Sequence, residues 1–340
     1  MKKATIYDIA AELNISTATV NRALNNKPNV SAKTRALVLA KAEELGFTMN
    51  RAAKSLARRT LRMDFIIYNR VPVFHDEIIA GARKAFEDLD GFNVSGEIHA
   101  FTGSDYMVHQ CMLDKMQALF EEKHDGLLLL GTFDISGFPE MIQRFEENGL
   151  RVGLVGSDIP GSGRTFNIRQ DDVCAGRLAA ELLFRFGGKQ PVAAFTGRPD
   201  NLGHMQSIGG FCEECDRRGL QVAAVYENYD DPEFAAYNTE RLFREHPEIG
   251  GLYVNSANSE PVCRKLVQMG LGGKIALVTS DLFDEIRDYM RRDVVQATIF
   301  QDPFRQGYQA VEKMYKYLAE GQVPEDVMAI EPAVILQSHI

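Results

Sequence analysis

The sequence predicts an α/β protein in which a small all-helical N-terminal unit precedes two lobes built on parallel sheets. From Asp64 onward, short apolar runs alternate with amphipathic helical stretches, which is the order of βαβ units. The first 45 residues instead carry closely spaced helix caps and breakers. The charge changes as well: residues 1–62 hold 12 Lys and Arg against 4 Asp and Glu, a net +8, and the rest hold 26 against 43, a net −17. A basic module on an acidic body points to a polyanionic partner for the module alone.

The N-terminal unit begins with a helix expected at about 6–13. Thr5 followed by Asp8 is a capping pair, and the apolar residues that follow have helical spacing. Asn14 should end this helix, because asparagine tolerates the left-handed backbone conformation.

Two further helices follow after short breaks. Ser16 is expected to cap the second helix, whose inner face is Val20, Ala23 and Leu24. Ser31 is expected to cap a third helix at about 32–45. Its predicted inner side is Ala36, Leu37, Leu39, Ala40 and Leu45.

Two short helices joined by a tight turn and supported by a third have the helix-turn-helix plan, in which the second helix enters the major groove of DNA. Arg22 has the fork geometry that suits a guanine edge, and Thr17 and Ala18 offer methyl groups to thymine. Candidate phosphate contacts are Lys2, Lys3, Lys27, Lys33 and Arg35. The alternative is a three-helix bundle that binds another protein.

Three stretches carry a family resemblance: "TIYDIAAELNISTATVNRALN" from Thr5, "NVSAKTRALVLAKAEELGF" from Asn29, and "NRAAKSLA" at 50–57. The chain resembles LacI/GalR-family transcription regulators over its whole length, most strongly in the first 60 residues. It departs from the family where Asn14 replaces the usual glycine of the turn and Asn21 the usual serine before the arginine. The resemblance implies a DNA-binding domain at 1–48, a hinge at 49–62 and an effector-binding and dimerisation domain at 63–340.

The same resemblance implies which residues contact double-stranded operator DNA. In the hinge, paired helices would insert Leu56 into the minor groove, with Ala53 and Lys54 beside it. A flexible linker with one incidental leucine is the alternative for this segment. The expected DNA-binding residues are Thr5, Tyr7, Ser16, Thr17, Ala18, Thr19, Asn21, Arg22, Asn25, Asn29, Ser31, Lys33, Lys54 and Leu56.

The remaining 275 or so residues are long enough for two βαβ lobes. The first lobe is expected at about 63–160 and 300–328, and the second at about 161–299 and 329–340. A last strand is expected within "AIEPAVILQ", after Met328. The apolar runs that predict the other strands are 65–68, 126–131, 152–156, 192–197, 251–255 and 275–281.

Ligands of such sheets bind at the carboxyl ends of the strands, so the polar residues after each run are the candidates. Together they resemble the cleft of periplasmic-binding-protein-like effector domains, which implies a sugar, polyol or related polar effector. Amide and carboxylate groups suit hydroxyl-rich ligands. The expected effector-binding residues are Asn69, Phe74, His75, Thr132, Asp158, Arg198, His204, Ser207, Asn255, Asp281 and Gln301.

One of these residues departs from the resembled family. In "HMQSIGGF", Ser207 occupies a position where many members have an arginine that binds effector hydroxyls. Serine is too short to replace a guanidinium. We expect Arg198 or His204 to substitute for it, or the effector to have a different shape.

The sequence shows no motif for catalysis, a cofactor or a metal. The "CEEC" at 212–215 lacks further ligands, and the histidines show no metal-ligand spacing. Five scattered cysteines indicate a reducing compartment, and no apolar run is long enough to span a membrane. We therefore expect a cytoplasmic, homodimeric, ligand-controlled repressor that is not an enzyme. The alternative is a solute-binding or sugar-handling protein that uses the same two lobes.

Overall fold

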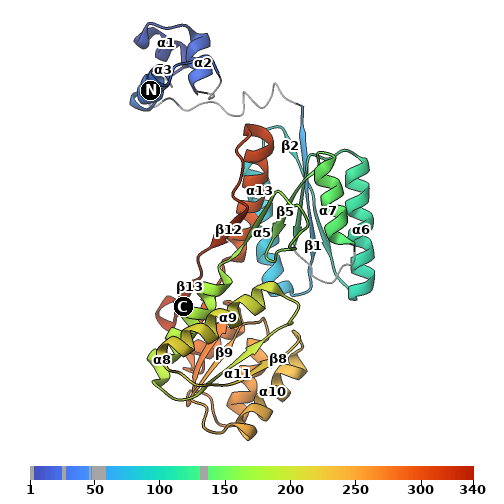
Figure 1. Ribbon diagram of the computed structural model, residues 1–340, viewed down its shortest axis with the longest axis vertical. Helices are drawn as coiled ribbons and strands as arrows, with labels where there is room; N and C mark the ends of the chain where they lie inside the picture. The colour runs from blue at the N-terminus through green and yellow to red at the C-terminus, as the bar shows by residue number, and fades with distance from the viewer. Residues whose placement is uncertain (1–3, 25–27, 46, 48–58, 131–136) are drawn as a thin grey trace. The chain divides into compact units, whose positions relative to one another are not determined.

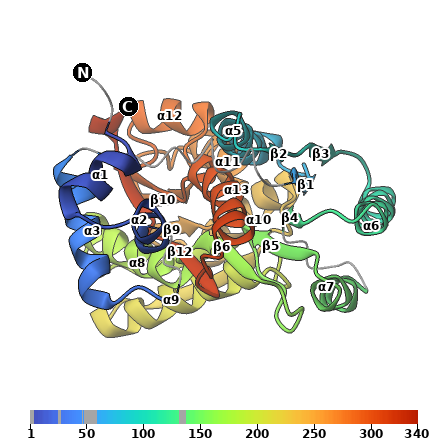
Figure 2. The same ribbon diagram turned by 90° about the horizontal axis from the view of Figure 1, so that it is seen from above.

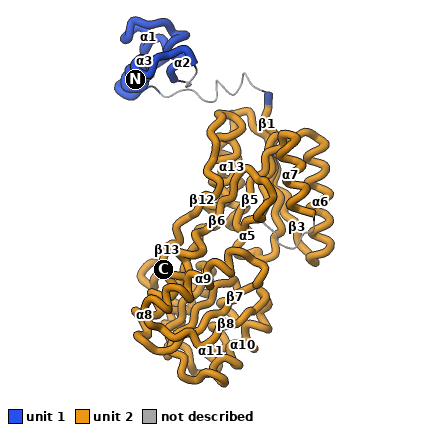
Figure 3. The backbone as a smooth tube through the Cα atoms, in the orientation of Figure 1, with its two compact units in different colours: residues 1–59 blue, residues 60–340 orange. Residues whose placement is uncertain are grey.

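The computed structural model describes residues 4–24, 28–45, 47, 59–130 and 137–340. It has two compact units, residues 1–59 and residues 60–340 (Figure 3), and each is described here by itself. The predicted hinge at 49–62 lies mostly outside the described residues.

Among its described residues, the N-terminal unit contains three helices, α1 (Ile6–Leu13), α2 (Thr17–Leu24) and α3 (Ala32–Glu44). The predicted caps are confirmed. Thr5 and Asp8 form a reciprocal capping box, and Asn14 ends α1 in the left-handed conformation with φ of 50°. The hydroxyl oxygens of Ser16 and Ser31 accept hydrogen bonds from the backbone nitrogens of Thr19 (3.1 Å) and Thr34 (3.0 Å).

The core of this unit corrects the prediction for α3. Ile9, Val20 and Val38 are fully buried, whereas Leu37 and Leu39 are 53% and 50% exposed. Successive helical residues differ by about 100° around the axis. Once Val38 faces α1 and α2, its two neighbours must therefore point away from the core.

The first lobe of the second unit is built on a parallel sheet, as predicted. Among the described residues it has seven strands in the order β12-β6-β5-β4-β1-β2, with β3 also paired to β1. The strands are β1 (Leu61–Tyr68), β2 (Val94–Ser95), β3 (Ile98–Phe101), β4 (Gly126–Leu130), β5 (Arg151–Val155), β6 (Phe166–Gln170) and β12 (Val327–Ile330).

Helices cover both faces of this sheet (Figures 1 and 2). On one face, α5 (Pro72–Asp88) and α13 (Pro303–Glu320) bury a core against the strands. On the other, α6 (Asp105–Glu121) and α7 (Phe138–Glu147) bury a second core. Burial on both faces explains why β4, "GLLLL", is a continuous apolar run.

The second lobe has a six-stranded sheet in the order β13-β11-β10-β9-β7-β8. Its strands are parallel except for β13, which pairs antiparallel with β11. The strands are β7 (Val192–Thr196), β8 (Val222–Glu227), β9 (Gly251–Val254), β10 (Ala276–Ser280), β11 (Ala297–Phe300) and β13 (Ala333–Leu336).

Two layers of helices enclose this sheet as well. One contains α8 (Asp172–Gly187) and α9 (Leu202–Arg218). The other contains α10 (Pro232–Glu245), α11 (Ser259–Gln268) and α12 (Asp284–Arg291). A 3-10 turn, η1 (Gln337–His339), follows β13.

The chain crosses between the sheets at positions that differ from the predicted lobe limits. β6 belongs to the first sheet, so that sheet continues to Gln170 rather than ending near 160. The stretch expected to hold one last strand holds two: β12 ends at Ile330 in the first sheet, and β13 begins at Ala333 in the second. Pro332 lies between them and has no N–H to donate to a sheet.

Candidate functional site

A cavity of about 200 Å³ lies between the two lobes of the second unit. Tyr68 lines it at the end of β1, and Asn255, Asp281 and Gln301 line it just after β9, β10 and β11. The carboxyl ends of parallel strands meet at one edge of each sheet. The two sheets therefore turn their strand ends, and the polar residues after them, toward the same space.

Asp281 is the most unusual group of the cavity. It is buried directly after β10, with 4% of its surface exposed, and its φ of 69° is a left-handed conformation that aspartate tolerates. Gln301 Nε2 donates to its Oδ2 at 3.0 Å. Its Oδ1 is buried and has no hydrogen-bond partner among the described residues. Burial raises the pKa of Asp281 to about 7, against the opposing effect of the hydrogen bond from Gln301.

Two side-chain amides nearby likewise have one polar atom in a hydrogen bond and the other without a partner. Asn255 Nδ2 donates to the His204 carbonyl at 3.1 Å, and Gln170 Nε2 donates to Asp172 Oδ1 at 3.2 Å. The amide oxygens of Asn255 and Gln170 are buried without a partner in the described part of the chain. Buried polar atoms are normally paired, so these oxygens are free to accept hydrogen bonds from a bound molecule.

Asp172 and Arg169 form a second polar group at this edge. Arg169 Nη1 donates to Asp172 Oδ2 at 2.9 Å and to Gln206 Oε1 at 2.5 Å. Burial raises the pKa of Asp172, although Arg169 acts in the opposite direction. Asp172 lines the cavity.

Aromatic side chains form much of the remaining wall. Phe74 and His75 lie edge to face, with ring centroids 5.6 Å apart. Burial lowers the pKa of His75 to about 4, so its imidazole is neutral at pH 7. Tyr253 is fully buried, and its hydroxyl lies 2.9 Å from that of Ser207. Tyr68 donates to Asp105 and to the Gly103 carbonyl.

The structure brings together eight of the eleven residues predicted for the effector. The eight that line the cavity are Phe74, His75, Arg198, His204, Ser207, Asn255, Asp281 and Gln301. Thr132 lies outside the described residues.

Two predicted effector residues do not line the cavity. Asp158 accepts two hydrogen bonds from Arg164, Nε to Oδ1 and Nη2 to Oδ2, each at 2.6 Å. That ion pair engages both of its carboxylate oxygens, and Asp158 is not among the residues that line the cavity. Asn69 Nδ2 donates to Asp76 at 2.8 Å, and its Oδ1 is buried without a partner in the described part of the chain, but Asn69 does not line the cavity.

The sequence prediction missed several lining residues, among them Arg70, Gln170, Asp172, Tyr253 and Ser280. Tyr253 and Ser280 lie inside predicted strands, just before the polar ends that were chosen. Gln170 is the last residue of β6, a strand with too few apolar positions to be predicted from the sequence. Asp172 is the first residue of α8.

Arg198 and His204 were proposed to replace the arginine that Ser207 displaces. Both line the cavity. Arg198 Nη2 is paired with Asp200 at 2.6 Å, and its backbone nitrogen donates to His204 Nδ1 at 3.1 Å. His204 therefore has one ring nitrogen occupied and the other available to a ligand.

In the N-terminal unit, Tyr7, Ala18, Asn21 and Arg22 are exposed, with Tyr7 at 70%. Thr17 and Thr19 are half-buried at the start of α2. The other described candidates for DNA binding, Thr5, Ser16, Asn29, Ser31 and Lys33, are also exposed. Asn25, Lys54 and Leu56 lie outside the described residues.

Within the described part of the chain, the helices are too short or too polar to cross a lipid bilayer.

Comparisons with known proteins match both units. Residues 63–322 match the periplasmic binding protein domain family, and residues 5–50 match the lacI family of bacterial regulatory proteins. The maltose regulon regulatory protein MalI of Escherichia coli K12 is 27% identical over 259 residues, which cover 74% of this chain and 71% of that protein. The ribose operon repressor of the same strain is 28% identical over 251 residues, covering 72% and 71%.

Solved structures agree on the fold of the second unit. GanP, a glucose-galactose binding protein from Geobacillus stearothermophilus, has a TM-score of 0.73 and 21% identity, covering 83% of this chain and 99% of that one. A lacI-type helix-turn-helix unit followed by a periplasmic-binding-protein domain is the architecture of a DNA-binding transcriptional regulator, and this chain belongs to the LacI family of such regulators.

Proposed function

We propose that this regulator is a repressor whose affinity for operator DNA is controlled by a neutral, hydroxyl-rich effector, a sugar or polyol, bound in the cavity between the lobes. The observation that carries the proposal is the set of buried acceptor oxygens without partners on Asp281, Asn255 and Gln170, all of which line that cavity. A hydroxyl group can donate to such an oxygen and also accept from a neighbouring donor.

The size and polarity of the cavity support a small effector. Its volume of about 200 Å³ lies below the roughly 300–1,000 Å³ of pockets for drug-sized ligands. Aromatic walls at Phe74, Tyr68 and Tyr253 suit the apolar faces of a sugar ring. The names of the two bacterial relatives refer to maltose and ribose.

On the DNA side, we propose that α2 enters the major groove and that Arg22 contacts a guanine. Thr17, Ala18 and Asn21 lie on the same helix near the bases, and Lys33 and the helix caps Thr5, Ser16 and Ser31 lie near phosphates. This assignment is supported by the exposure of Ala18, Asn21 and Arg22 on α2 and by the exposed residues at the helix N-termini.

We also propose that the working unit is a homodimer. One helix-turn-helix contacts few base pairs, and two of them would contact the half-sites of a near-palindrome. Sedimentation of the full chain should give a dimer at micromolar concentration. A stable monomer or tetramer would contradict this proposal.

The test of the effector proposal is a gel shift on the DNA sequence that the full chain selects from a random pool, with and without a panel of sugars and polyols. One panel member should change the affinity of the wild type for DNA and should raise its melting temperature, because a ligand of the native state must stabilise it.

The variant Asp281→Asn serves as the matched control in the same assay. It should bind the DNA like the wild type and should lose the response to the effector. The proposal fails if no panel member changes either DNA binding or the melting temperature. It also fails if Asp281→Asn responds as the wild type does.

A further inference from the structure

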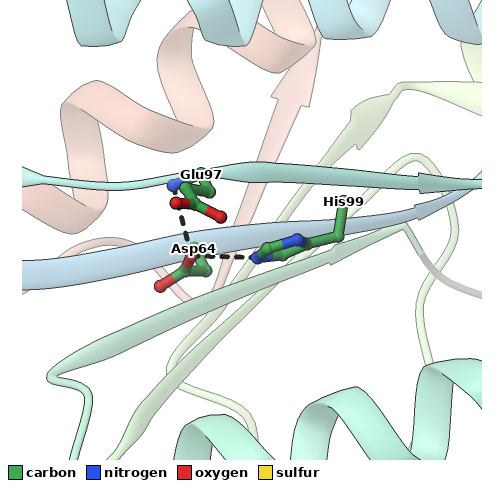
Figure 4. Close-up of side chains that lie close together, drawn as sticks. All are labelled: Asp64, Glu97 and His99. Carbon is green, nitrogen blue, oxygen red and sulfur yellow. Dashed lines mark hydrogen bonds and ion pairs between the residues drawn. The ribbon is translucent and has the colours of Figure 1, made fainter.

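A second polar cluster lies further back along β1, away from the strand end at Tyr68 that lines the cavity. Asp64 is the fourth residue of β1, Glu97 immediately precedes β3, and His99 lies within β3 (Figure 4). β1 pairs with β3 with Phe65 opposite Ile98 and Ile66 opposite His99. This parallel register brings the three side chains together from two strands.

The potential ligand atoms of these residues are close. One atom from each of Asp64, Glu97 and His99 lies within 4.8 Å of the other two. His99 Nε2 lies 3.0 Å from Asp64 Oδ1. A tetrahedral ion with bonds of about 2.0–2.2 Å keeps its ligand atoms roughly 3.3–3.6 Å apart. Glu97 is exposed, so its side chain can turn inward to complete this spacing.

The surroundings hold Asp64 in place. Its carboxylate side chain is only 4% exposed, and His124 Nδ1 contacts its second oxygen, Oδ2. The other ring nitrogen of His124 lies 3.3 Å from Glu122 Oε2. Burial would raise the pKa of Asp64, but the hydrogen bond with His99 and the neighbouring His124 outweigh burial and lower it. Ligand carboxylates of metal sites are themselves hydrogen-bonded by surrounding groups, and His124 is such a group for Asp64.

Space for an ion and its water is present beside the cluster. A cavity of about 150 Å³ is lined by Asp64, Glu97, Glu122 and His124, together with Arg62 and Lys115. Arg62 is already paired with Glu122 at 2.9 Å. Asp64 and Glu97 line this cavity, whereas His99 reaches the cluster from outside its lining.

We propose that Asp64, Glu97 and His99 form a binding site for one divalent transition-metal ion, with zinc the representative ion. One imidazole and two carboxylates suit zinc and its first-row neighbours, whereas magnesium prefers oxygen ligands alone. His124 acts as a positioning residue that orients Asp64. The site is separate from the cavity between the lobes.

The sequence did not predict this site because its residues have no diagnostic spacing. Asp64 is 33 residues before Glu97, and only the pairing of β1 with β3 brings them together.

The test is calorimetric titration of ZnCl₂ into the full chain, expressed without a histidine tag and dialysed against a chelator that is then removed. The wild type should bind one zinc ion per chain and melt at a higher temperature in its presence. His99→Gln keeps a hydrogen-bond donor for Asp64 but lacks the imidazole, and it should lose at least about tenfold in affinity. Glu97→Gln should also weaken binding, and MgCl₂ should not compete.

His246→Gln is the matched control, because His246 also lies near a carboxylate, 3.5 Å from Glu248, but in the second lobe. It should bind zinc as the wild type does. The proposal is overturned if the wild type shows no saturable binding of one zinc ion. It is equally overturned if His99→Gln binds zinc as tightly as the wild type, or if His246→Gln loses the zinc.

Discussion

At the scale of single residues, Asp281 combines two properties that oppose each other in the ligand-free protein. Its burial favours the protonated form and raises its pKa to about 7, whereas its unpartnered Oδ1 is the acceptor that a hydroxyl ligand needs. A ligand that donates to the carboxylate stabilises the ionised form. Effector binding and ionisation of Asp281 should therefore be coupled.

The first prediction follows from the sign of that coupling. Because the ionised carboxylate is the better acceptor, effector affinity should rise as the pH increases through about 7, and binding near that pH should release a proton. Calorimetric titration at about pH 5.5 and about pH 8.5, in buffers of different ionisation enthalpy, measures both effects.

Asp281→Asn provides the control for this prediction. The affinity of this variant for the effector should be at least about tenfold lower than that of the wild type. An amide has one acceptor oxygen where the carboxylate has two, so a donor of the effector loses its partner. Other ionisable groups line the cavity, and the variant separates the contribution of Asp281 from theirs. An equally strong rise in affinity with pH in Asp281→Asn would contradict the assignment.

At the scale of elements, each lobe has one pair of helices in close contact through glycine. A Cβ atom on Gly210 of α9 would lie 2.3 Å from the Val173 carbonyl oxygen of α8, and one on Gly176 of α8 would lie 1.9 Å from the Ser207 carbonyl oxygen. In the first lobe, a Cβ atom on Gly81 of α5 would meet the backbone of α13, and one on Gly307 of α13 would meet the backbone of α5. The α8 contact fixes the position of α9, which carries His204 and Ser207 into the cavity.

The second prediction compares two adjacent glycines of α9. Gly210→Ala must push α8 and α9 apart and should lower the free energy of unfolding by about 1–3 kcal/mol. Gly209→Ala meets no atom within 4 Å and should raise it by about 0.5–1 kcal/mol, because alanine favours the helix. Denaturant unfolding of both variants measures the difference. Shifts of the same sign would show that the close contact is not what constrains Gly210.

The third prediction concerns α2 of the N-terminal unit. Arg22→Ala should weaken binding to the selected DNA by about 1–3 kcal/mol and relax the preference at one base pair, if Arg22 contacts a guanine with both ends of its fork. Competition gel shifts with every single-base variant of the site measure both effects.

Lys33→Ala is the comparison variant, since Lys33 is exposed on α3 and was assigned to phosphate. It should weaken binding to all sequences alike and reduce the salt dependence. If the Arg22→Ala protein retained the sequence preference of the wild type, the assignment of α2 to base contacts would be wrong.

At the scale of the whole molecule, the second unit contains every residue that lines the effector cavity. The chain passes between its two sheets three times: after β6, after β11 and after β12. Gln301 lies directly after β11, where the second crossing begins, and it donates to Asp281. A hydrogen bond of the cavity is therefore located at a connection between the lobes.

The fourth prediction is that residues 60–340, expressed alone, fold and bind the effector with the affinity of the full chain, because the cavity lies entirely within this unit. The fragment should not bind the selected DNA. Calorimetry and gel shift check the two parts. A tenfold or greater loss of effector affinity in the fragment would show that the N-terminal unit contributes to the site.

The sequence by itself determined the features that depend on neighbouring residues. The caps at Thr5, Ser16 and Ser31 were predictable because a cap joins groups two or three residues apart. The cavity residues Asn255 and Asp281 were predictable because each ends an apolar run, and parallel strands present such ends to a ligand.

Only the tertiary structure decided which polar groups are already paired and which distant strands lie together. Asp158 follows one strand and Asp281 follows another, but Arg164 pairs with both oxygens of Asp158, whereas Oδ1 of Asp281 has no partner among the described residues. The antiparallel pairing of β13 and the meeting of Asp64 with His99 likewise depend on strand order. Strand order is set by the packing of whole helical layers, and no local stretch of sequence contains that information.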